Sequence, residues 1–108
     1  MKSILKFTFM GLVLAAAAQA QNPANGKALF IKQQCFRCHG TDGQGGAGAR
    51  LAPTPPTVAA MQKYVRNPTG AMPPYTNQVS DSDIADIRAY LATVPAPPAV
   101  KDIPLLNQ

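Results

Sequence analysis

Apolar residues recur with helical spacing in three stretches of the chain, and no stretch alternates long enough to indicate a useful strand. The first runs from 22 to 34, where an Asn-Pro pair is typical of a helix start. The second begins near residue 57, and the third begins at an acidic capping box over 80–83 and ends before a proline at 95. The apolar positions are Ala28, Leu29, Phe30 and Ile31; then Val58, Met61, Tyr64 and Val65; then Ile84, Ile87, Tyr90, Leu91 and Val94. The pattern predicts an all-α protein of short helices.

Glycines and prolines occupy the segments between these helices. Five glycines lie within 40–48, so we expect a flexible loop there. Three prolines within 51–56 exclude a helix interior, and two adjacent prolines predict an irregular loop over 69–75. Residues 95–108 contain four prolines and no periodic pattern, which predicts an extended tail. This tail is either a frayed terminus or a strap that lies on a partner protein. The apolar contacts of such a strap would be Ile103, Leu105 and Leu106.

Residues 1–20 have the layout of a secretory signal peptide. Lys2 and Lys6 form a basic start, residues 7–18 are uncharged and mostly apolar, and an A-x-A cleavage signal follows at 18–20. The apolar run is short for a membrane span, which needs about 20 residues. We therefore expect cleavage after residue 20 and no stable membrane span, with a retained membrane anchor as the alternative.

Cleavage changes the size and the charge of the protein that has to fold. It leaves 88 residues, which we expect to form one small domain at 21–94 followed by the tail. A domain of this size has a thin core and needs an additional staple. Two of the ten basic side chains leave with the signal, so eight remain against five acidic ones. The resulting net charge of +3 is too weak to indicate nucleic-acid binding.

Both cysteines and the only histidine lie within one run of five residues, Cys35-Phe36-Arg37-Cys38-His39. A C-x-x-C-H run is typical of covalent haem attachment, in which both thiols bond to one porphyrin and the adjacent imidazole becomes an axial ligand of the iron. The alternatives are a thioredoxin-like dithiol, a structural disulfide and a partial metal site. A zinc site would normally need four ligands, and the chain offers only three. A haem would also supply the missing staple.

A haem held through this motif leaves one axial position on the iron, which decides between electron transfer and substrate chemistry. Two methionines lie outside residues 1–20, Met61 and Met72. Met61 lies on the apolar face of the second predicted helix, where methionine usually fills the core. Met72 lies in the proline-bounded loop, with no predicted helix to pack against. We expect Met72 to coordinate the iron and keep Met61 as the alternative.

With these motifs the chain resembles the class I c-type cytochromes over nearly all of the mature domain. Gly26 and Phe30 match positions in the family's first helix, and Tyr90 matches the aromatic residue of its last helix, which crosses the first. Residues 64–75 are similar to the distal segment of small monohaem members, which supports Met72 as the ligand. The resemblance implies a small cytochrome c fold, with three to four short helices packed around one covalently attached haem c.

The resemblance also assigns residues around the haem. Residues 49–51 correspond to a family stretch that reads Pro-x-Leu, in which the proline carbonyl accepts a hydrogen bond from the imidazole Nδ1. Ala49 can serve in the same way, because a carbonyl does not need proline. Arg50 either approaches a haem propionate or is a solvated loop arginine. Leu51 and Ile87 are expected to pack against the haem.

The expected function is therefore single-electron transfer by one haem whose iron is bound by His39 and Met72. The resemblance implies an exported, periplasmic protein with redox partners. In one setting the protein is the cytochrome subunit of a dehydrogenase, which is its electron donor. In the other it is a shuttle that passes electrons to a cytochrome or oxidase acceptor. The alternative from another class is a haem enzyme or gas sensor with a displaceable sixth ligand. That alternative needs a distal group for proton transfer, and the chain has no second histidine.

Overall fold

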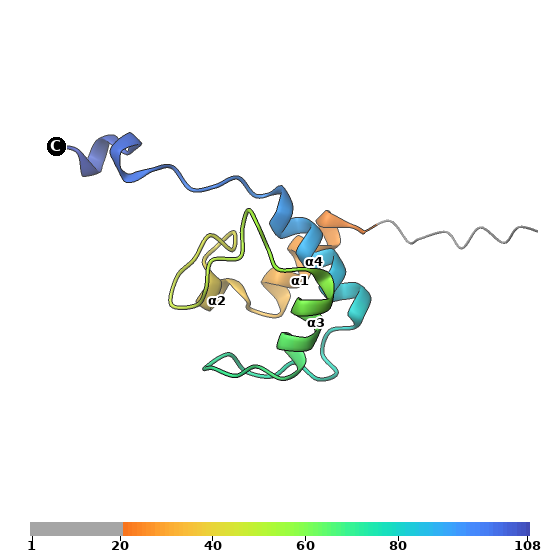
Figure 1. The fold of residues 1–108 in the computed structure, drawn as a ribbon. Coiled ribbons are helices and arrows are strands. Elements are labelled where there is room, and N and C mark those ends of the chain that lie inside the picture. Colours follow the sequence, from red (N-terminus) through yellow and green to blue (C-terminus); the bar gives the residue numbers. More distant parts are fainter. Residues whose placement is uncertain (1–20) are drawn as a thin grey trace, which may run out of the picture.

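The structure, a computed structural model, describes residues 21–108, so the predicted signal peptide lies outside the described residues. The described part contains four α-helices, two 3-10 turns and no strands, which confirms the predicted all-α fold (Figure 1). The elements are α1 (Pro23–Lys32), α2 (Phe36–His39), α3 (Val58–Arg66), α4 (Asp81–Thr93), η1 (Val100–Asp102) and η2 (Pro104–Leu106). None of the helices within 21–108 is long and apolar enough to cross a bilayer.

Side-chain caps explain where the three longer helices begin. The Asn22 side chain accepts a hydrogen bond from a backbone N–H in the first turn of α1, and the Thr57 side chain does the same for α3. Ser80 and Asp83 form the predicted capping box of α4, in which each side chain accepts from the other residue's backbone N–H. These contacts satisfy donors that have no partner within the helix. The cap positions therefore set the start of each helix.

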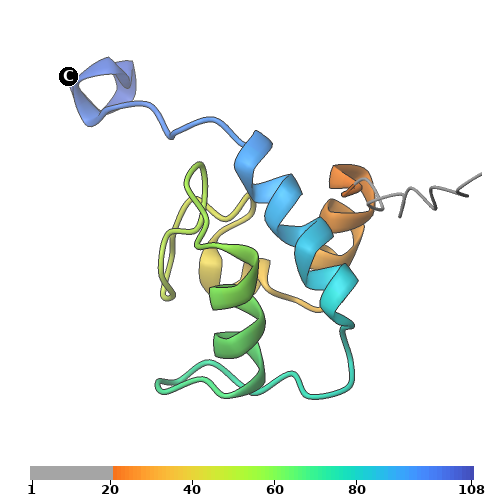
Figure 2. The same cartoon turned by 45° about the vertical axis from the view of Figure 1, so that its right-hand side comes forward.

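Helices α1 and α4 pack against each other at the centre of the fold, and α3 contacts α4 (Figure 2). Gly26 lies at the crossing, where an added Cβ would overlap the backbone carbonyl of Asp86 and lie 2.8 Å from Ile87 N. The rings of Phe30 and Tyr90 meet nearby with their centroids 5.8 Å apart. The residues that matched the family's first and last helices thus meet in this structure. The buried core consists of Phe30, Ala52, Met61, Val79, Ile84, Ile87, Tyr90, Leu91 and Val94.

The apolar face of α1 differs from the one that the sequence pattern predicts. Gly26 and Phe30 are buried and Leu29 is half-buried, whereas Ala28 is exposed and Ile31 is 51% exposed. Positions three and four apart lie on one side of a helix, so residues 26, 29 and 30 form the contact face. The prediction erred because it counted apolar side chains, whereas the closest approach of the two helices is made by a glycine.

The glycine-rich segment 40–48 forms no helix or strand, as predicted, and backbone hydrogen bonds connect it to the C-x-x-C-H motif. Gly45 N donates to the His39 carbonyl at 2.8 Å, and Gly48 N donates to the Cys38 carbonyl at 2.7 Å. A Cβ added at Gly48 would lie 3.2 Å from the Cys38 carbonyl oxygen and from the His39 ring. At Gly46 a Cβ would lie only 2.7 Å from the same carbonyl oxygen, so this backbone can lie directly against the C-x-x-C-H motif only with glycine there.

A part-buried hydrogen bond joins α4 to the same glycine-rich segment. The Tyr90 hydroxyl donates to Asp42 Oδ1 at 2.9 Å. Burial and this contact with the carboxylate raise the pKa of Tyr90 from 10.0 to about 12. Because the folded pKa lies above the ordinary value, the protonated hydroxyl stabilises the fold at every pH below about 10. That contribution is lost as the pH rises through about 12.

Replacing Tyr90 with phenylalanine should lower the free energy of unfolding by about 1 kcal/mol at neutral pH, the usual net value of one hydrogen bond. It should also reduce the loss of stability between pH 10 and 12, because the titrating group is gone. Urea unfolding at neutral and alkaline pH measures both effects. Tyr64→Phe is the control, since Tyr64 is 44% exposed. A Tyr90 variant whose stability falls as steeply above pH 10 as that of the wild type would contradict the prediction.

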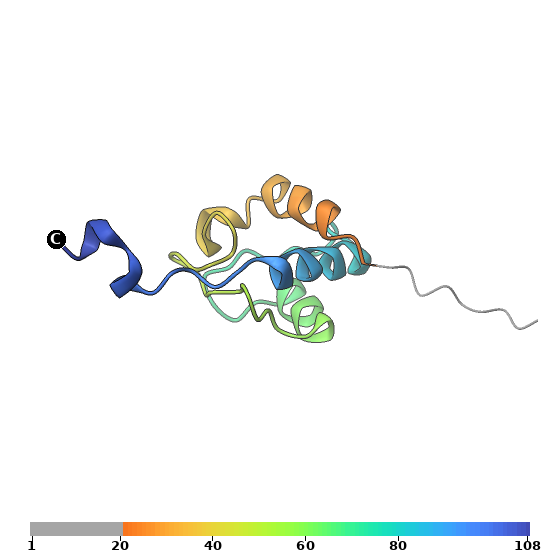
Figure 3. The same ribbon diagram turned by 90° about the horizontal axis from the view of Figure 1, so that it is seen from above.

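The tail after α4 is extended over residues 95–99 and then folds on itself. The Asn107 side-chain amide donates to the carbonyls of Val100, Lys101 and Ile103, at 3.0, 2.9 and 2.9 Å. These bonds connect the turns η1 and η2, which no periodic pattern predicted because each spans only three residues. Figure 3 shows the tail reaching away from the helices. Its exposed apolar side chains are Val100, Leu105 and Leu106, at 66%, 79% and 62%.

Candidate functional site

The C-x-x-C-H motif forms the single-turn helix α2 directly after a sharp change of chain direction. Helix α1 ends at Lys32, before the end of the predicted range, because Gln34 takes a left-handed conformation with φ 60°. Cys35 then precedes α2 as its N-cap residue. Cys38 and His39 follow Cys35 by three and four positions, the spacing at which side chains share one side of a helix. Cys35 is half-buried and Cys38 is exposed.

The His39 ring is oriented by the backbone of the glycine-rich segment. Nδ1 of His39 lies 2.7 Å from the Ala49 carbonyl oxygen. A carbonyl only accepts hydrogen bonds, so Nδ1 carries the proton and the lone pair of Nε2 remains available to a metal. The expectation that Ala49 replaces the family's proline as the acceptor is confirmed by this contact.

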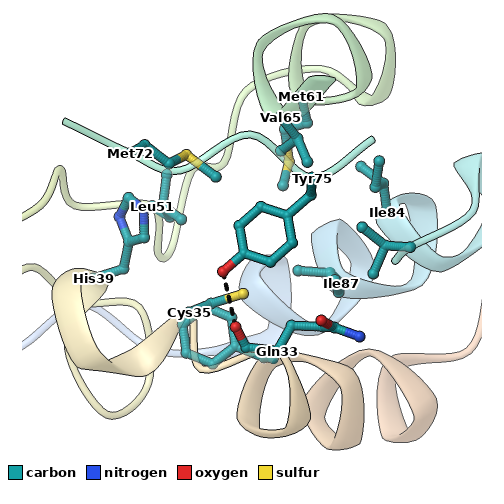
Figure 4. Close-up of a pocket in the computed structure, with 12 residues that line it drawn as sticks. Gln33, Cys35, His39, Leu51, Met61, Val65, Met72, Tyr75, Ile84 and Ile87 are labelled. Carbon is teal, nitrogen blue, oxygen red and sulfur yellow. Dashed lines mark hydrogen bonds between the residues drawn. The ribbon is translucent and has the colours of Figure 1, made fainter. Parts of the chain in front are cut away.

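An apolar cavity lies beside α2, and Figure 4 shows the side chains around it. Its lining residues are Phe30, Gln33, Cys35, His39, Leu51, Met61, Val65, Met72, Tyr75, Val79, Ile84 and Ile87. These residues come from α1, α2, α3, α4 and the loops between them. The predicted iron ligands and the apolar residues expected to pack against the haem therefore face one common space.

The predicted site residues divide into two groups around this cavity. Cys35, His39, Leu51 and Met72 line it. Cys38 and Arg50 are exposed and lie outside the lining. Cys38 nonetheless belongs to α2 with His39, whereas the backbone and Cβ of Arg50 lie beside Gly45.

Both candidate methionines line the cavity, from different elements. Met61 belongs to α3 and is only 8% exposed, which agrees with its expected place in the core. Met72 is half-buried in the loop that follows α3. Figure 4 draws Met72 on the side of the cavity where His39 lies, and draws Met61 beside Val65. A helix thus carries Met61 and an irregular loop carries Met72.

Tyr75 is a lining residue that the sequence reasoning did not identify. Its hydroxyl donates to the Gln33 carbonyl at 2.9 Å, across the cavity from the loop to the end of α1. Burial raises the pKa of this phenol, and the nearby Cys35 and Cys38 raise it further. Its place three residues after Met72, as the one aromatic side chain of that loop, was a signal that could have found it.

The side chains present fit a covalent haem. The Cys35 thiol, the His39 imidazole and the Met72 thioether line one apolar space, and Cys38 lies next to His39 on α2. This is the donor set of a His/Met-ligated c-type haem. Burial raises the pKa of the Cys35 thiol, with a smaller opposing effect from its backbone hydrogen bond. A catalytic dithiol instead needs a lowered thiol pKa, so the site fits thioether chemistry better. Within 21–108, no three side chains of His, Cys, Asp or Glu gather as a metal-binding group.

Comparison with known proteins shows the family to which the chain belongs. The family described as "Cytochrome C oxidase, cbb3-type, subunit III" matches residues 21–91. Cytochrome c6 of Synechocystis sp. is 34% identical over 89 residues, an alignment that covers 72% of this chain and 70% of that protein. No solved structure matches significantly. The chain belongs to the class I c-type cytochromes, the small helical proteins that bind one covalent haem c and carry electrons.

Proposed function

We propose that Cys35 and Cys38 form the two thioether bonds to the haem, and that His39 and Met72 are the axial ligands of its iron. One observation carries this assignment: an imidazole whose Nδ1 is held by Ala49 lines the same apolar cavity as the Met72 thioether. The bound haem would supply an iron that alternates between the ferrous and ferric states.

The residues of the chain have separate roles in this function. Ala49 keeps the His39 ring in one orientation and one tautomer, with Nε2 available to the iron. The thioether of Met72 favours ferrous iron and so raises the reduction potential. Leu51 and Ile87 exclude water from the site, which also affects the potential. With His39 and Met72 both bound to it, the iron would have no open position for a substrate, so the site would suit single-electron transfer.

Arg50 contributes less than these residues. Its side chain is exposed, and the residue lies outside the cavity lining. An exposed guanidinium is a weak partner for a carboxylate, because solvent screens the pair. The solvated role is therefore better supported than a buried ion pair with a haem propionate.

We further propose that the chain is exported to the periplasm, with residues 1–20 as a cleaved signal and residues 95–108 as a tail outside the cytochrome domain at 21–94. The layout of residues 1–20 supports export. Thioether attachment in c-type cytochromes also follows export across the inner membrane.

Within this setting we favour a cytochrome subunit or acceptor of a periplasmic dehydrogenase over a shuttle to a terminal oxidase. The exposed apolar side chains of η1 and η2 support a lasting contact with one partner. The shuttle to a terminal oxidase is the second candidate. A gene for a flavin, quinone or molybdenum dehydrogenase beside this gene would favour the subunit role.

The covalent attachment can be tested on protein purified from cells that mature c-type cytochromes. We expect the mature chain to gain the mass of one haem and to keep its colour after acid–acetone extraction. A Cys35→Ser/Cys38→Ser double variant should lose all pigment in the same extraction, because no thioether can form. Cys38→Ser alone should keep one bond and serve as the intermediate control. A wild-type chain with the mass of the bare polypeptide would refute the proposed function.

A further inference from the structure

The loop that carries Met72 is closed at its base by one arginine. Arg66 is the last residue of α3, and its side chain is 24% exposed. Its Nη1 donates to the carbonyl of Tyr75 at 2.8 Å and to the carbonyl of Val79 at 2.7 Å. A single guanidinium nitrogen therefore binds two backbone groups of the segment 67–80, on the C-terminal side of Met72.

The other terminal nitrogen of this guanidinium binds the start of the next helix. Arg66 Nη2 lies 2.8 Å from Asp81 Oδ1, and Asp81 is the first residue of α4. The Asp81 side chain is 71% exposed, so the ion pair by itself contributes little to stability. Its effect is to hold the planar guanidinium in the orientation that both carbonyls need.

A second contact completes the closure of the loop. Tyr75 N donates to the Val65 carbonyl at 2.9 Å, next to the bond from Arg66 to the Tyr75 carbonyl. Both backbone polar groups of Tyr75 are thus held by consecutive residues of α3. The closed segment is 67–74, a short loop with Met72 near its end. Holding the two ends of a loop together reduces the number of conformations that its residues can adopt.

The closed segment depends on these contacts at its base. Three of its residues are prolines, at 68, 73 and 74, and proline has no backbone N–H to donate. Met72 immediately precedes two of them and is half-buried. Its thioether faces the cavity only while the backbone that returns at Tyr75 stays against α3.

We propose that Arg66 is the positioning residue for the Met72 thioether, holding the ligand loop closed so that the sulfur stays on the iron. This inference rests on the proposed function, in which Met72 is the axial ligand. Arg66 is not among the residues that line the cavity, whereas Tyr75 and Val79, whose carbonyls it binds, do line it. The position of the Met72 sulfur then depends on the hydrogen bonds that Arg66 makes at the base of the loop.

The test uses purified holoprotein and exogenous imidazole, which competes with the thioether for ferric iron. In Arg66→Gln we expect imidazole to bind about tenfold more tightly, because opening the loop no longer breaks charge-assisted hydrogen bonds. Arg66→Lys should lie between this variant and the wild type, since an ammonium cannot reproduce the planar fork. Arg88→Gln is the matched control, because Arg88 also donates to a backbone carbonyl, that of Pro56, outside the ligand loop.

A second readout separates positioning from general stability. Denaturant should abolish the weak ferric sulfur-to-iron band of the Arg66 variants well before it abolishes the helical circular dichroism, with a wider gap than in the wild type. Unchanged imidazole affinity in the Arg66 variants would overturn the proposal. So would a loss of the sulfur-to-iron band and of the helical circular dichroism at denaturant concentrations lowered by the same amount. If Arg66→Gln yields no holoprotein, Arg66→Lys is judged by the same criteria. If the sulfur-to-iron band survives replacement of Met72, the ligand assignment itself is refuted. If the band is lost with Met72 but the Arg66 variants behave like the wild type, only the positioning role of Arg66 is refuted.

Discussion

Replacing Met72 with alanine should abolish the ferric sulfur-to-iron band of the holoprotein and lower its reduction potential by on the order of 0.1 V or more, since axial ligands tune haem potentials over about 0.8 V. The physical reason is the loss of a thioether that favours ferrous iron. Water or a solute would take the open position, so the variant should also bind small ligands that the wild type excludes. Optical spectra and a redox titration measure these changes.

Met61→Leu is the matched control for this experiment. Met61 lines the same cavity from α3, and leucine has a similar volume, so the substitution should cost less than about 1.5 kcal/mol of stability. It should leave the sulfur-to-iron band and the potential near their wild-type values. The reverse outcome, a band lost with Met61 and kept without Met72, would show that the iron is bound from α3.

Replacing Gly26 with valine should lower the free energy of unfolding by more than about 4 kcal/mol, or prevent folded holoprotein from accumulating. A Cβ at this position would overlap the Asp86 carbonyl of α4, and a backbone group cannot swing aside as a side chain can. The two helices would have to separate, which would expose Phe30 and Tyr90. Chemical denaturation followed by circular dichroism measures the loss.

Gly70→Ala is the control for the glycine substitution. An added Cβ at Gly70 would meet only the Tyr64 hydroxyl, at an ordinary 3.6 Å. This variant should therefore keep the stability of the wild type within about 0.5 kcal/mol, as surface substitutions usually do. A Gly26→Val protein that is as stable as Gly70→Ala would show that α1 and α4 do not cross at residue 26.

The sequence alone predicts those features that depend on neighbouring residues. The starts of α1, α3 and α4 follow from caps at Asn22, Thr57 and Ser80, which act within one helical turn. The C-x-x-C-H motif is equally local. Its haem chemistry was therefore predictable, and the family membership agrees with it.

The contacts between distant segments could not be predicted in this way. The bonds from Arg66 to Val79 and from Tyr75 to Gln33 join residues 13 and 42 positions apart, and no local pattern encodes such pairs. The early end of α1 arises from a single left-handed residue, Gln34, whose side chain gives no warning of it. The contacts between 40–48 and the C-x-x-C-H motif were not predicted, because glycine is typical both of mobile loops and of backbones that pack closely.

The bond that orients the imidazole has a consequence for natural variation in this chain. The acceptor is a main-chain oxygen of Ala49, and the side chain there is exposed, so position 49 is free to drift among many amino acids. Its neighbour Gly48 is more constrained, because a Cβ there would make a tight contact of 3.2 Å with the His39 ring and with the Cys38 carbonyl oxygen. Among natural variants, position 48 should therefore remain glycine more often than position 49 remains alanine.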